Sequence, residues 1–420
     1  MFSPEAFRQL PVFITTMSRW DGDVSSASLA LAKVLSQQTK VFYIDYPYTW
    51  LDVWRERKQP TVQRRMRALL SGNDFLTSVP GQSERFKAAT PRAVLPVYSL
   101  PDGSIYRWVS HQNNQRVAGL VKRILKQEGL KDFIFLNSFN PQYLASIRTY
   151  LDPVLSVYHS RDAIEEVPGH GLDRENECAT HYDLILATAQ QLCRNIAQRN
   201  HVAVKHFPNG GDVRLFRTAI EPGYPKPKEL EDIQTPIIGY TGAVCQRIDY
   251  PLMVKVANAF PDHTLLIIGP RKDHEFTSIR LDDYPNIRFL GARKLEELPA
   301  YLQYMDAAII PFLKNNLTGG IYPLKINEYL ASGRSVVTTD FSADIQGFAD
   351  HIRIAADHDQ FIEQLRLALQ DHDLTLPQQR FQAARSNSWD NRLELFWSLA
   401  YDAYLARIRA RTINPHPHDE

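Results

Sequence analysis

The sequence has few of the features that mark secreted, zinc-bound or membrane-spanning proteins. Only three of its 420 residues are cysteines, and Cys178, Cys193 and Cys245 form no CxxC pair. This scarcity argues against a disulfide scaffold and against a structural zinc site. No apolar run approaches the ~20 residues that a membrane-spanning helix needs. The N-terminal MFSPEAFRQL lacks a basic region followed by a long apolar stretch, so we expect no secretory signal.

An excess of charge of one sign is also missing. Lysine and arginine number 48, and aspartate and glutamate number 47, which gives a formal net charge of +1. Without a strongly basic field, nucleic acid is not an expected partner. Apolar residues make up 44% and charged residues 23% of the chain, as in an ordinary globular protein of two or three domains. We therefore expect a cytoplasmic protein.

Strand-like apolar runs alternate with helical patterns along most of the chain. Examples are PVFITT, KVFYID and TLLIIG; between residues 72 and 110 the pattern weakens, and only AVLPVYSL predicts a strand. The alternation predicts an α/β fold with parallel sheets, divided by a segment rich in proline and charge. The predicted divisions are an N-terminal domain (1–216), a linker (217–235), a C-terminal domain (236–388), a long helix (389–411) and a disordered tail (412–420).

The stretch 315–339, NNLTGGIYPLKINEYLASGRSVVTT, combines a glycine turn, a helix and a strand. We expect Gly319 and Gly320 to take positive φ, Pro323 to lie in the first helical turn and Gly333 to follow the helix. A glycine turn that leads into a helix N-terminus offers N–H groups and the positive end of the helix dipole to an anion.

Two charged side chains follow this turn at helical spacing. Lys325 adds a cation, and Glu328 lies one turn further on, where it could accept hydrogen bonds from a pair of hydroxyls. The local chemistry suggests a phosphorylated ligand that carries a sugar. The alternative is that this is the ordinary turn of any βαβ unit.

Two further loops of the second half follow predicted strands. Gly242 would let a ligand approach the backbone, Arg247 could fork onto a diphosphate, and Asp249 is expected to cap the next helix. Gly291 precedes Arg293, which could stack on a base whose edge bonds to the loop backbone. The alternatives are that both arginines are solvated surface residues.

Loops after strands of the first half hold polar residues. They are 19–23, 137–140, 159–162 and 209–212, which we expect at one edge of the sheet because parallel strands end there together. Asp21 and Asp23 form a D-x-D, a pattern that holds a metal in another class of sugar-transferring enzyme. We favour a helix cap and a first-turn acid instead, and predict no metal. The candidate residues of this edge are Trp20, Asp21, Gly22, Asn137, His159 and Asp162.

Aromatic and basic residues are mixed between residues 46 and 67. They are Tyr46, Tyr48, Trp50, Leu51 and Trp54, followed by Arg55, Arg57, Lys58, Arg64, Arg65 and Arg67. This mixture suits a membrane interface or a lipid phosphate, and would give a peripheral contact at the inner face of the membrane through Trp50 to Arg67. The alternative is a solvated basic face with the aromatic side chains packed inward.

Several motifs resemble one known family. PLKINEYLASGRSVV, together with IGYTGAVCQRID and FPNGGDVRLF, resembles the GT-B glycosyltransferases of family 4, also called glycosyltransferases group 1, in the branch with teichuronic acid and exopolysaccharide transferases. The resemblance implies two Rossmann-like domains facing across a cleft, with the acceptor on the N-terminal side. The C-terminal domain would bind a nucleoside diphosphate sugar, and the helix at 389–411 would return to the first domain.

The resemblance also assigns roles. Arg247 and Lys325 match positions that contact the donor diphosphate, and Glu328 matches the second acid of the family's E-x7-E motif, which holds the ribose hydroxyls. The first acid is absent, since Gly320 occupies its place, so the backbone of Gly319, Gly320 and Ile321 would contact the donor instead. Asn137 and His159 are candidates for the family's first-domain histidine.

The family implies a retaining hexosyltransferase that needs neither metal nor cofactor besides its nucleotide-sugar substrate. The acceptor would be a glycan or lipid-linked molecule in polysaccharide or cell-surface glycan biosynthesis. Two alternatives stay open: a sugar-nucleotide or glycan binding protein that has lost catalysis, because of Gly320, and a GT-B sugar-nucleotide epimerase.

Overall fold

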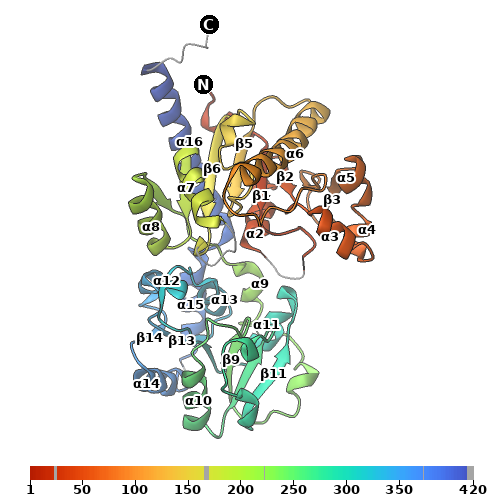
Figure 1. Ribbon diagram of the computed structural model, residues 1–420. Coiled ribbons are helices and arrows are strands. Elements are labelled where there is room, and N and C mark those ends of the chain that lie inside the picture. Colours follow the sequence, from red (N-terminus) through yellow and green to blue (C-terminus); the bar gives the residue numbers. More distant parts are fainter. Residues whose placement is uncertain (23–25, 165–169, 222, 372, 414–420) are drawn as a thin grey trace. The chain divides into compact units, whose positions relative to one another are not determined.

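The computed structural model describes residues 1–22, 26–164, 170–221, 223–371 and 373–413 (Figure 1). The chain divides into two compact units, one formed by Met1–Pro208 with Leu393–Glu420 and the other by Asn209–Arg392. The second unit therefore takes in residues 209–216, which the sequence analysis assigned to the first domain. Residues 414–420 of the expected disordered tail lie outside the described residues.

The first unit is built on an eight-stranded sheet with the order β3-β4-β2-β1-β5-β6-β7-β8. Neighbouring strands are parallel, except for the antiparallel pair β3-β4. The strand order reverses between β1 and β5, where the chain changes its direction of travel across the sheet. The strands are β1 (Val12–Thr16), β2 (Val41–Ile44), β3 (Leu76–Ser78), β4 (Phe86–Ala89), β5 (Ile134–Ser138), β6 (Leu155–Ser160), β7 (Leu184–Ala187) and β8 (Val204–His206).

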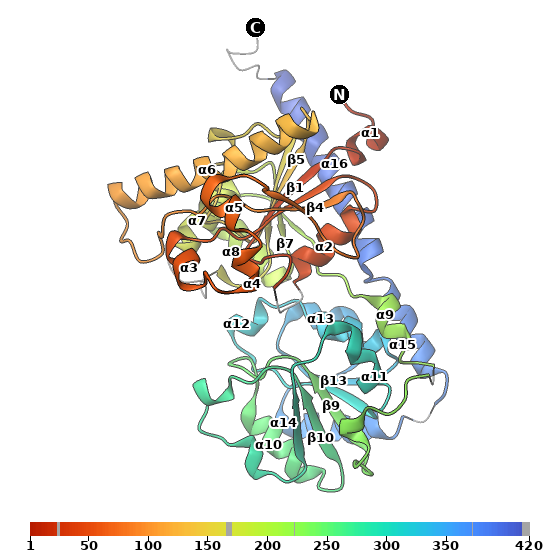
Figure 2. The ribbon, with the colours of Figure 1, turned by 90° about the vertical axis from the view of Figure 1, so that its right-hand side faces the viewer.

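Helices cover both faces of this sheet (Figure 2). One face packs against α6 and α7 around Phe13, Phe42 and Phe135, while α2, α1 and α16 lie on the other. The helices are α1 (Pro4–Arg8), α2 (Ala27–Leu35), α3 (Trp50–Arg55), α4 (Pro60–Gln63), α5 (Met66–Ser71), α6 (Ser104–Glu128), α7 (Gly171–His181), α8 (Gln190–Asn200) and α16 (Trp389–Ile413), with a 3₁₀ turn η1 (Ile147–Thr149).

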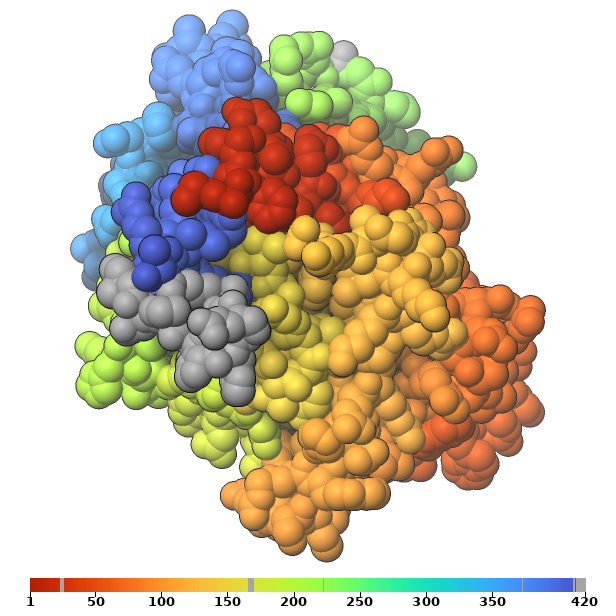
Figure 3. Space-filling view, turned by 90° about the horizontal axis from the view of Figure 1, so that it is seen from above, coloured from red at the N-terminus to blue at the C-terminus, as the bar shows by residue number. Residues whose placement is uncertain are grey.

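The two ends of the chain meet in the first unit. The ring of Phe7 in α1 lies 6.2, 5.4 and 5.0 Å from the rings of Trp397, Tyr401 and Tyr404 in α16. Figure 3 shows the N-terminal segment in red beside the blue end of α16. These aromatic contacts account for the assignment of residues after Leu393 to the first unit.

The second unit has a six-stranded, fully parallel sheet with the order β11-β10-β9-β12-β13-β14. Its strands are β9 (Ile237–Thr241), β10 (Thr264–Ile268), β11 (Ile287–Gly291), β12 (Ala307–Ile310), β13 (Ser335–Thr339) and β14 (Arg353–Ala355). The strands β9, β12 and β13 are almost wholly buried, which explains why they are continuous apolar runs in the sequence.

Short and long helices connect these strands. They are α9 (Val213–Arg217), α10 (Tyr250–Ala259), α11 (Leu298–Leu302), α12 (Asn316–Gly319), α13 (Leu324–Ala331), α14 (His358–Leu369) and α15 (Leu376–Arg385). The 3₁₀ turns are η3 (Lys228–Leu230), η4 (Asp273–Glu275), η5 (Leu281–Asp283), η6 (Leu295–Glu297) and η7 (Ala343–Phe348). The α/β class with parallel sheets is thus confirmed.

The weakly periodic region of the first unit was predicted wrongly. AVLPVYSL forms no strand, and its Val94 makes only an isolated bridge with Thr49. Pro96 stands in the middle of this run, and its missing N–H cannot join a ladder. The strands of this region are β3 and β4, which lie at the edge of the sheet.

Candidate functional site

The sheet of the second unit reverses its strand order between β9 and β12. From β9 the chain proceeds to β10 and β11 on one side, and then to β12, β13 and β14 on the other. Loops that leave β9 and β12 therefore diverge, and ligands of such sheets bind beyond the strand ends at this point. The loop after β9 carries Gly242 and Arg247, and the loop after β12 leads to Lys325 and Glu328 on α13.

Two glycines let the ends of β9 and β10 approach each other. Gly242 has a φ of +145° and Gly269 a φ of +157°, which lie in the region that favours glycine. A Cβ atom on Gly269 would lie 2.0 Å from the carbonyl oxygen of Gly242, and one on Gly242 would lie 2.4 Å from Cε of Lys325. The missing side chain of Gly242 therefore makes the room that Lys325 occupies above the strand end.

The glycine pair before α13 does not have the expected conformation. Gly319 ends the one-turn helix α12, and Gly320 caps this helix with a φ of −82°, so the prediction of positive φ for the pair is wrong. The capping box between Asn315 and Thr318 starts a helical turn, which these glycines complete. Both glycines are buried.

The two ends of α13 agree better with the sequence. Gly333 follows the helix with a φ of +74°, as predicted. Pro323 is the N-cap residue rather than the first helical residue.

Tyr329, which the sequence analysis missed, fixes α13 to the end of β9. Its hydroxyl accepts the N–H of Thr241 at 2.8 Å and lies 3.1 Å from the Thr241 hydroxyl. Tyr329 is fully buried and stands one helical turn after Lys325, on the same side of the helix. The spacing of a tyrosine four residues after the motif lysine is the signal that could have revealed this clamp.

Lys325 and Glu328 are half-buried on α13 and influence each other's ionisation. Burial lowers the pKa of Lys325; Glu328 opposes this effect, and the charge of Arg247 adds to it. Burial also raises the pKa of Glu328 to about 7, against the lowering effect of Lys325. Among the described residues, neither side chain takes part in a side-chain hydrogen bond. Charged groups in this state are typical of sites where a ligand supplies the partner.

The segment 209–212 follows β8 in the chain, as expected, and it lies against α13. A Cβ atom on Gly211 would lie 2.8 Å from Cβ of Asn327. The neighbouring Asp212 caps α9, and its negative charge adds to the raised pKa of Glu328. The segment therefore borders the Glu328 site within the second unit.

Arg293 is held by the protein itself. Its guanidinium donates hydrogen bonds to the Tyr301 hydroxyl at 3.0 Å, the Leu290 carbonyl at 2.8 Å and the Glu229 carboxylate at 2.8 Å. Gly291, with a φ of +72°, makes the turn at the start of this loop. These contacts favour a structural role for Arg293 over stacking on a base.

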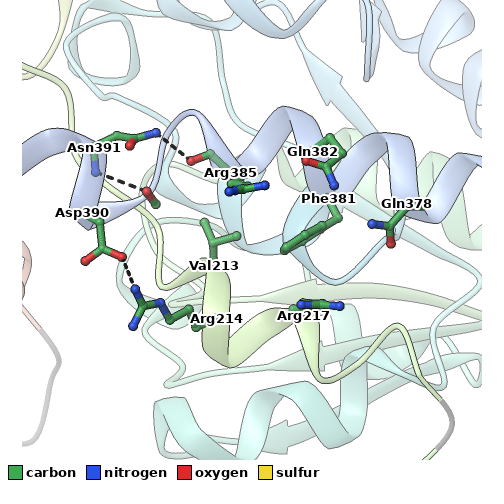
Figure 4. Close-up of a pocket in the computed structure, with 10 residues that line it drawn as sticks. Val213, Arg214, Arg217, Gln378, Phe381, Gln382, Arg385, Asp390 and Asn391 are labelled. Carbon is green, nitrogen blue, oxygen red and sulfur yellow. Dashed lines mark hydrogen bonds and ion pairs between the residues drawn. The ribbon is translucent and has the colours of Figure 1, made fainter.

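A separate groove of the second unit lies between α9 and α15 and has a cavity volume of about 620 Å³ (Figure 4). It is lined by Val213, Arg214, Arg217, Gln378, Phe381, Gln382, Arg385, Ser388, Asp390 and Asn391. Arg214 pairs with Asp390 at 2.8 Å, and the guanidinium carbon of Arg217 lies 5.1 Å from the ring centre of Phe381. The groove contains none of the site residues expected from the sequence.

The charged residues at the switch point of the first unit bind one another. The guanidinium of Arg65 donates to both carboxylate oxygens of Asp21, at 2.8 and 2.7 Å, and to Asp45 at 2.9 Å. Thr90 donates to the same oxygen of Asp45 at 2.8 Å. Burial alone would raise the pKa of Asp21, yet Arg65 holds this pKa below its usual value. We call these four side chains the Arg65 network.

Asp21 bonds to Arg65 and is not the helix cap that we expected. The N-cap of α2 is Ser26, and Asp23 lies outside the described residues. Trp20 lies beside the Arg65 network, with its ring centre 5.7 Å from the Arg65 guanidinium carbon. Gly22 closes a turn by donating its N–H to the Arg19 carbonyl at 3.1 Å.

The other candidates of the first unit come from β5 and β6. Asn137 shapes its own loop, since its side chain donates to the carbonyls of Asn140 and Tyr143 and accepts from the Asn140 N–H. His159 is 1% exposed, its ring lies 5.1 Å from that of Phe207, and burial lowers its pKa well below the usual value. Asp162 follows β6 and accepts from the Ala163 N–H at 3.2 Å. The contacts named here give these three residues no common partner.

No helix in the part of the chain that the structure describes has the length and apolarity needed to cross a membrane. Within the same residues, no group of three or more His, Cys, Asp or Glu side chains is placed to hold a metal ion.

Known proteins are similar to this chain in sequence and in structure. Residues 235–371 match the family model of glycosyl transferases group 1. A Bacillus subtilis protein named as a teichuronic acid biosynthesis glycosyltransferase is 26% identical over 187 residues, which cover 43% of this chain and 47% of that protein. The match thus spans about half the length of that relative.

The similar structures extend over nearly the whole chain. Sucrose-phosphate synthase from Thermosynechococcus elongatus has a TM-score of 0.67 at 12% identity, and the match covers 95% of this chain and 100% of that one. An E. coli structure described as trehalose-6-phosphate bound with UDP-2-fluoro glucose has a TM-score of 0.64 at 13% identity, covering 94% and 99%. At such identities the likeness establishes the fold.

Two parallel-sheet α/β units, matched along their length to these structures, define a protein of the GT-B fold. Residues 235–371 of the second unit match the glycosyl transferases group 1 model, which confirms the resemblance drawn from the sequence motifs.

Proposed function

We propose that this protein is a retaining glycosyltransferase that moves a sugar from a nucleoside diphosphate sugar to a glycan or lipid-linked acceptor. The proposal rests on the position of Lys325, whose side chain lies against Gly242 at the point where the strand order of the second sheet reverses. The charges of Arg247 and Glu328 both act on this lysine. The E. coli structure of similar fold holds UDP-2-fluoro glucose, and the B. subtilis relative is named for teichuronic acid biosynthesis. We place the activity in the cytoplasm, in polysaccharide or cell-surface glycan biosynthesis.

Lys325 and Arg247 would act on the leaving group. When the sugar leaves, negative charge grows on the diphosphate, and two cations at the strand ends stabilise that charge. Burial lowers the pKa of Lys325, and the phosphates of the donor would stabilise its ammonium form. The backbone N–H groups of Gly319, Gly320 and Ile321 bond within the α12 turn, so the two cations would carry this stabilisation, and no step calls for a metal ion.

Glu328 would hold the ribose. Its carboxylate is half-buried beside Lys325, and a pair of ribose hydroxyls would donate to it when the donor binds. Departure of the diphosphate from the same face that the acceptor hydroxyl attacks would preserve the anomeric configuration.

The decisive experiment measures release of nucleoside diphosphate from candidate uridine and guanosine diphosphate sugars in the presence of glycan and lipid-linked acceptors. We expect Lys325→Ala to lower kcat by roughly 100- to 1000-fold, as loss of one donor to a developing anion does. The matched control is Lys314→Ala, because Lys314 also follows β12 but is 67% exposed and pairs with Asp340. Normal turnover by Lys325→Ala would contradict the proposal.

The second candidate is a binding protein without catalysis, favoured by Gly320. This residue occupies the place of the family's first acid, is buried and closes α12. Calorimetry with the same donors separates the two candidates, since a binding protein would take up donor without releasing diphosphate for any acceptor. Product analysis without acceptor tests the third candidate, a sugar-nucleotide epimerase, which would change the sugar and leave the diphosphate bond intact.

A further inference from the structure

Five large apolar side chains of the first unit are exposed to solvent, three on α3 and two at the start of α6. In α3 they are Trp50, Leu51 and Trp54, with exposed fractions of 38%, 40% and 64%. In α6 they are Ile105 and Trp108, with 69% and 60%. Isolated apolar residues on a surface need no explanation, but a group that includes three tryptophans marks an interaction site. We call these five residues the aromatic surface.

Each helix presents these residues on one side and packs with the other. Residues 50, 51 and 54 share a face of α3, and the intervening Val53 is 6% exposed. Residues 105 and 108 share a face of α6, while Tyr106 and Val109 are 2% and 7% exposed. The packing of both helices on the core therefore leaves these side chains exposed.

Both α3 and the first half of α6 contact the same segment, residues 94–97. The N–H of Trp50 donates to the Val94 carbonyl at 3.0 Å. The side chain of Asn113 in α6 bonds to both backbone groups of Leu95, at 2.8 and 2.9 Å. Next along the chain, Val97 packs in one cluster with Tyr106. One short segment thus supports both parts of the aromatic surface.

Cations surround the α3 part of this surface. The exposed basic residues of α3, α4 and α5 and their links are Arg55, Arg57, Lys58, Arg64 and Arg67. Between residues 50 and 71 the acids are Asp52 and Glu56, and Asp52 is engaged in the capping box of α3. The guanidinium carbon of Arg57 lies 5.3 Å from the ring centre of Trp54. Arg65 belongs to the basic cluster seen in the sequence, but it is buried and is not part of the exposed surface.

We propose that the first unit docks on an anionic lipid bilayer through the aromatic surface and these cations. Tryptophan side chains and long basic side chains both favour the boundary between headgroups and acyl chains. An acidic protein or a nucleic acid would satisfy the cations but leave Leu51 and Ile105 in water. A second copy would bring the same cations together, and these would repel. The proposal goes beyond glycosyl transfer and does not depend on it.

Ile105 and Trp108 distinguish this surface from the contact predicted for residues 50–67. From the sequence, Tyr46 and Tyr48 were counted with the membrane-facing aromatics, but Tyr48 is 1% exposed and Tyr46 packs against the core. Trp108 lies far along the chain, and only the fold gives it a common support with Trp54. If both parts of the aromatic surface enter the bilayer together, Trp108 contributes as much to vesicle binding as Trp54 does.

The test is sedimentation of the full chain with vesicles of phosphatidylcholine, with and without phosphatidylglycerol, at low salt. Wild type should sediment with the anionic vesicles only. Trp54→Ser and Trp108→Ser should each weaken binding about tenfold, and together roughly 100-fold, for partial burial of one indole each. Removing two charges with Arg57→Gln and Lys58→Gln should weaken binding roughly 30-fold, at about 1 kcal/mol per cation near the surface.

Two matched controls come from the second unit. Leu374 is 93% exposed and Lys228 is exposed, so Leu374→Ser and Lys228→Gln remove the same chemistry elsewhere and should leave binding unchanged. The proposal is overturned if wild type does not sediment with anionic vesicles, or if Leu374→Ser weakens binding as much as Trp54→Ser. It is also overturned if Trp108→Ser has no effect, or if the tryptophan variants change the mass of the protein in solution instead, which would indicate contact between copies.

Discussion

The strand-end edges of the two units use charged residues in opposite ways. In the first unit Arg65, Asp21, Asp45 and Thr90 satisfy one another at distances of 2.7–2.9 Å. In the second unit burial raises the pKa of the half-buried Glu328 to about 7, although the charge of Lys325 opposes this rise. Both edges lie at a point where the strand order reverses, so topology alone does not separate them.

The difference teaches how to distinguish structural from functional charge. A buried charge with a full set of hydrogen bonds holds two elements together, here α5 to the ends of β1 and β2. A charge that the protein desolvates without giving it a partner lowers stability. Proteins retain such a charge where a ligand later supplies the partner. We therefore expect substitutions at the first edge to affect folding and those at the second edge to affect binding and turnover.

The largest effect on folding should come from Arg65→Ala. This change leaves the fully buried Asp45 without its cation, and breaking a buried ion pair in this way typically costs about 3–5 kcal/mol. Urea unfolding followed by tryptophan fluorescence would measure the loss. Most tryptophans report on the first unit, namely Trp20, Trp50, Trp54, Trp108 and Trp397.

Arg65→Lys serves as the graded control for this prediction. Lysine keeps the charge but lacks the fork that spans Asp21 and Asp45, so an intermediate loss is expected. A loss below about 1 kcal/mol for Arg65→Ala, which is the range of a surface pair, would mean that the two edges do not differ as described.

A smaller effect of opposite sign is expected for Glu328→Gln. The folded protein binds the Glu328 proton more tightly than the unfolded chain, because the pKa is raised from 4.5 to about 7. Stability therefore falls as the pH rises through this window, and the loss is complete above it. Glutamine has no proton to lose, so the variant should be more stable than wild type by about 1–3 kcal/mol near pH 8 and nearly equal near pH 4.

Hydrogen exchange of peptides from α13, compared between variant and wild type at each pH, measures this change in the second unit. The same variant should bind nucleoside diphosphates more weakly near pH 8, where wild type presents a carboxylate. Equal stabilisation at both pH values would show that the gain does not come from the ionisation of Glu328.

Much of the second unit could be predicted from the sequence. The strands β9, β12 and β13 are almost wholly buried, so each is a largely apolar run that local pattern identifies. The place of Lys325 and Glu328 on one helix was also predicted correctly, because their spacing is a local feature. The proposal that they bind a donor rests on the same motif.

The first edge could not be predicted in this way. Asp21 bonds to a residue 44 positions along the chain, and Asp45 to Arg65 across 20 positions, so no local spacing links them. The role of Tyr329 could not be predicted for the same reason, since its partner Thr241 is 88 residues away. The conformation of Gly320 was missed for a different reason: the capping box of Asn315 and Thr318 fixes φ more strongly than glycine's own freedom does.

The smallest effect is expected for Arg64→Ala, which sharpens the comparison within the first edge. Arg64 binds the same Asp21 carboxylate as Arg65, at 3.2 Å, but its side chain is 45% exposed where that of Arg65 is 3% exposed. A partner in solvent is worth little, so the loss should stay below about 1 kcal/mol. It should also vanish near 1 M salt, where charges are screened beyond about 3 Å, while the loss from Arg65→Ala persists. A loss from Arg64→Ala that equals the loss from Arg65→Ala and resists salt would contradict the claim that desolvation, rather than the presence of an ion pair, makes this edge structural.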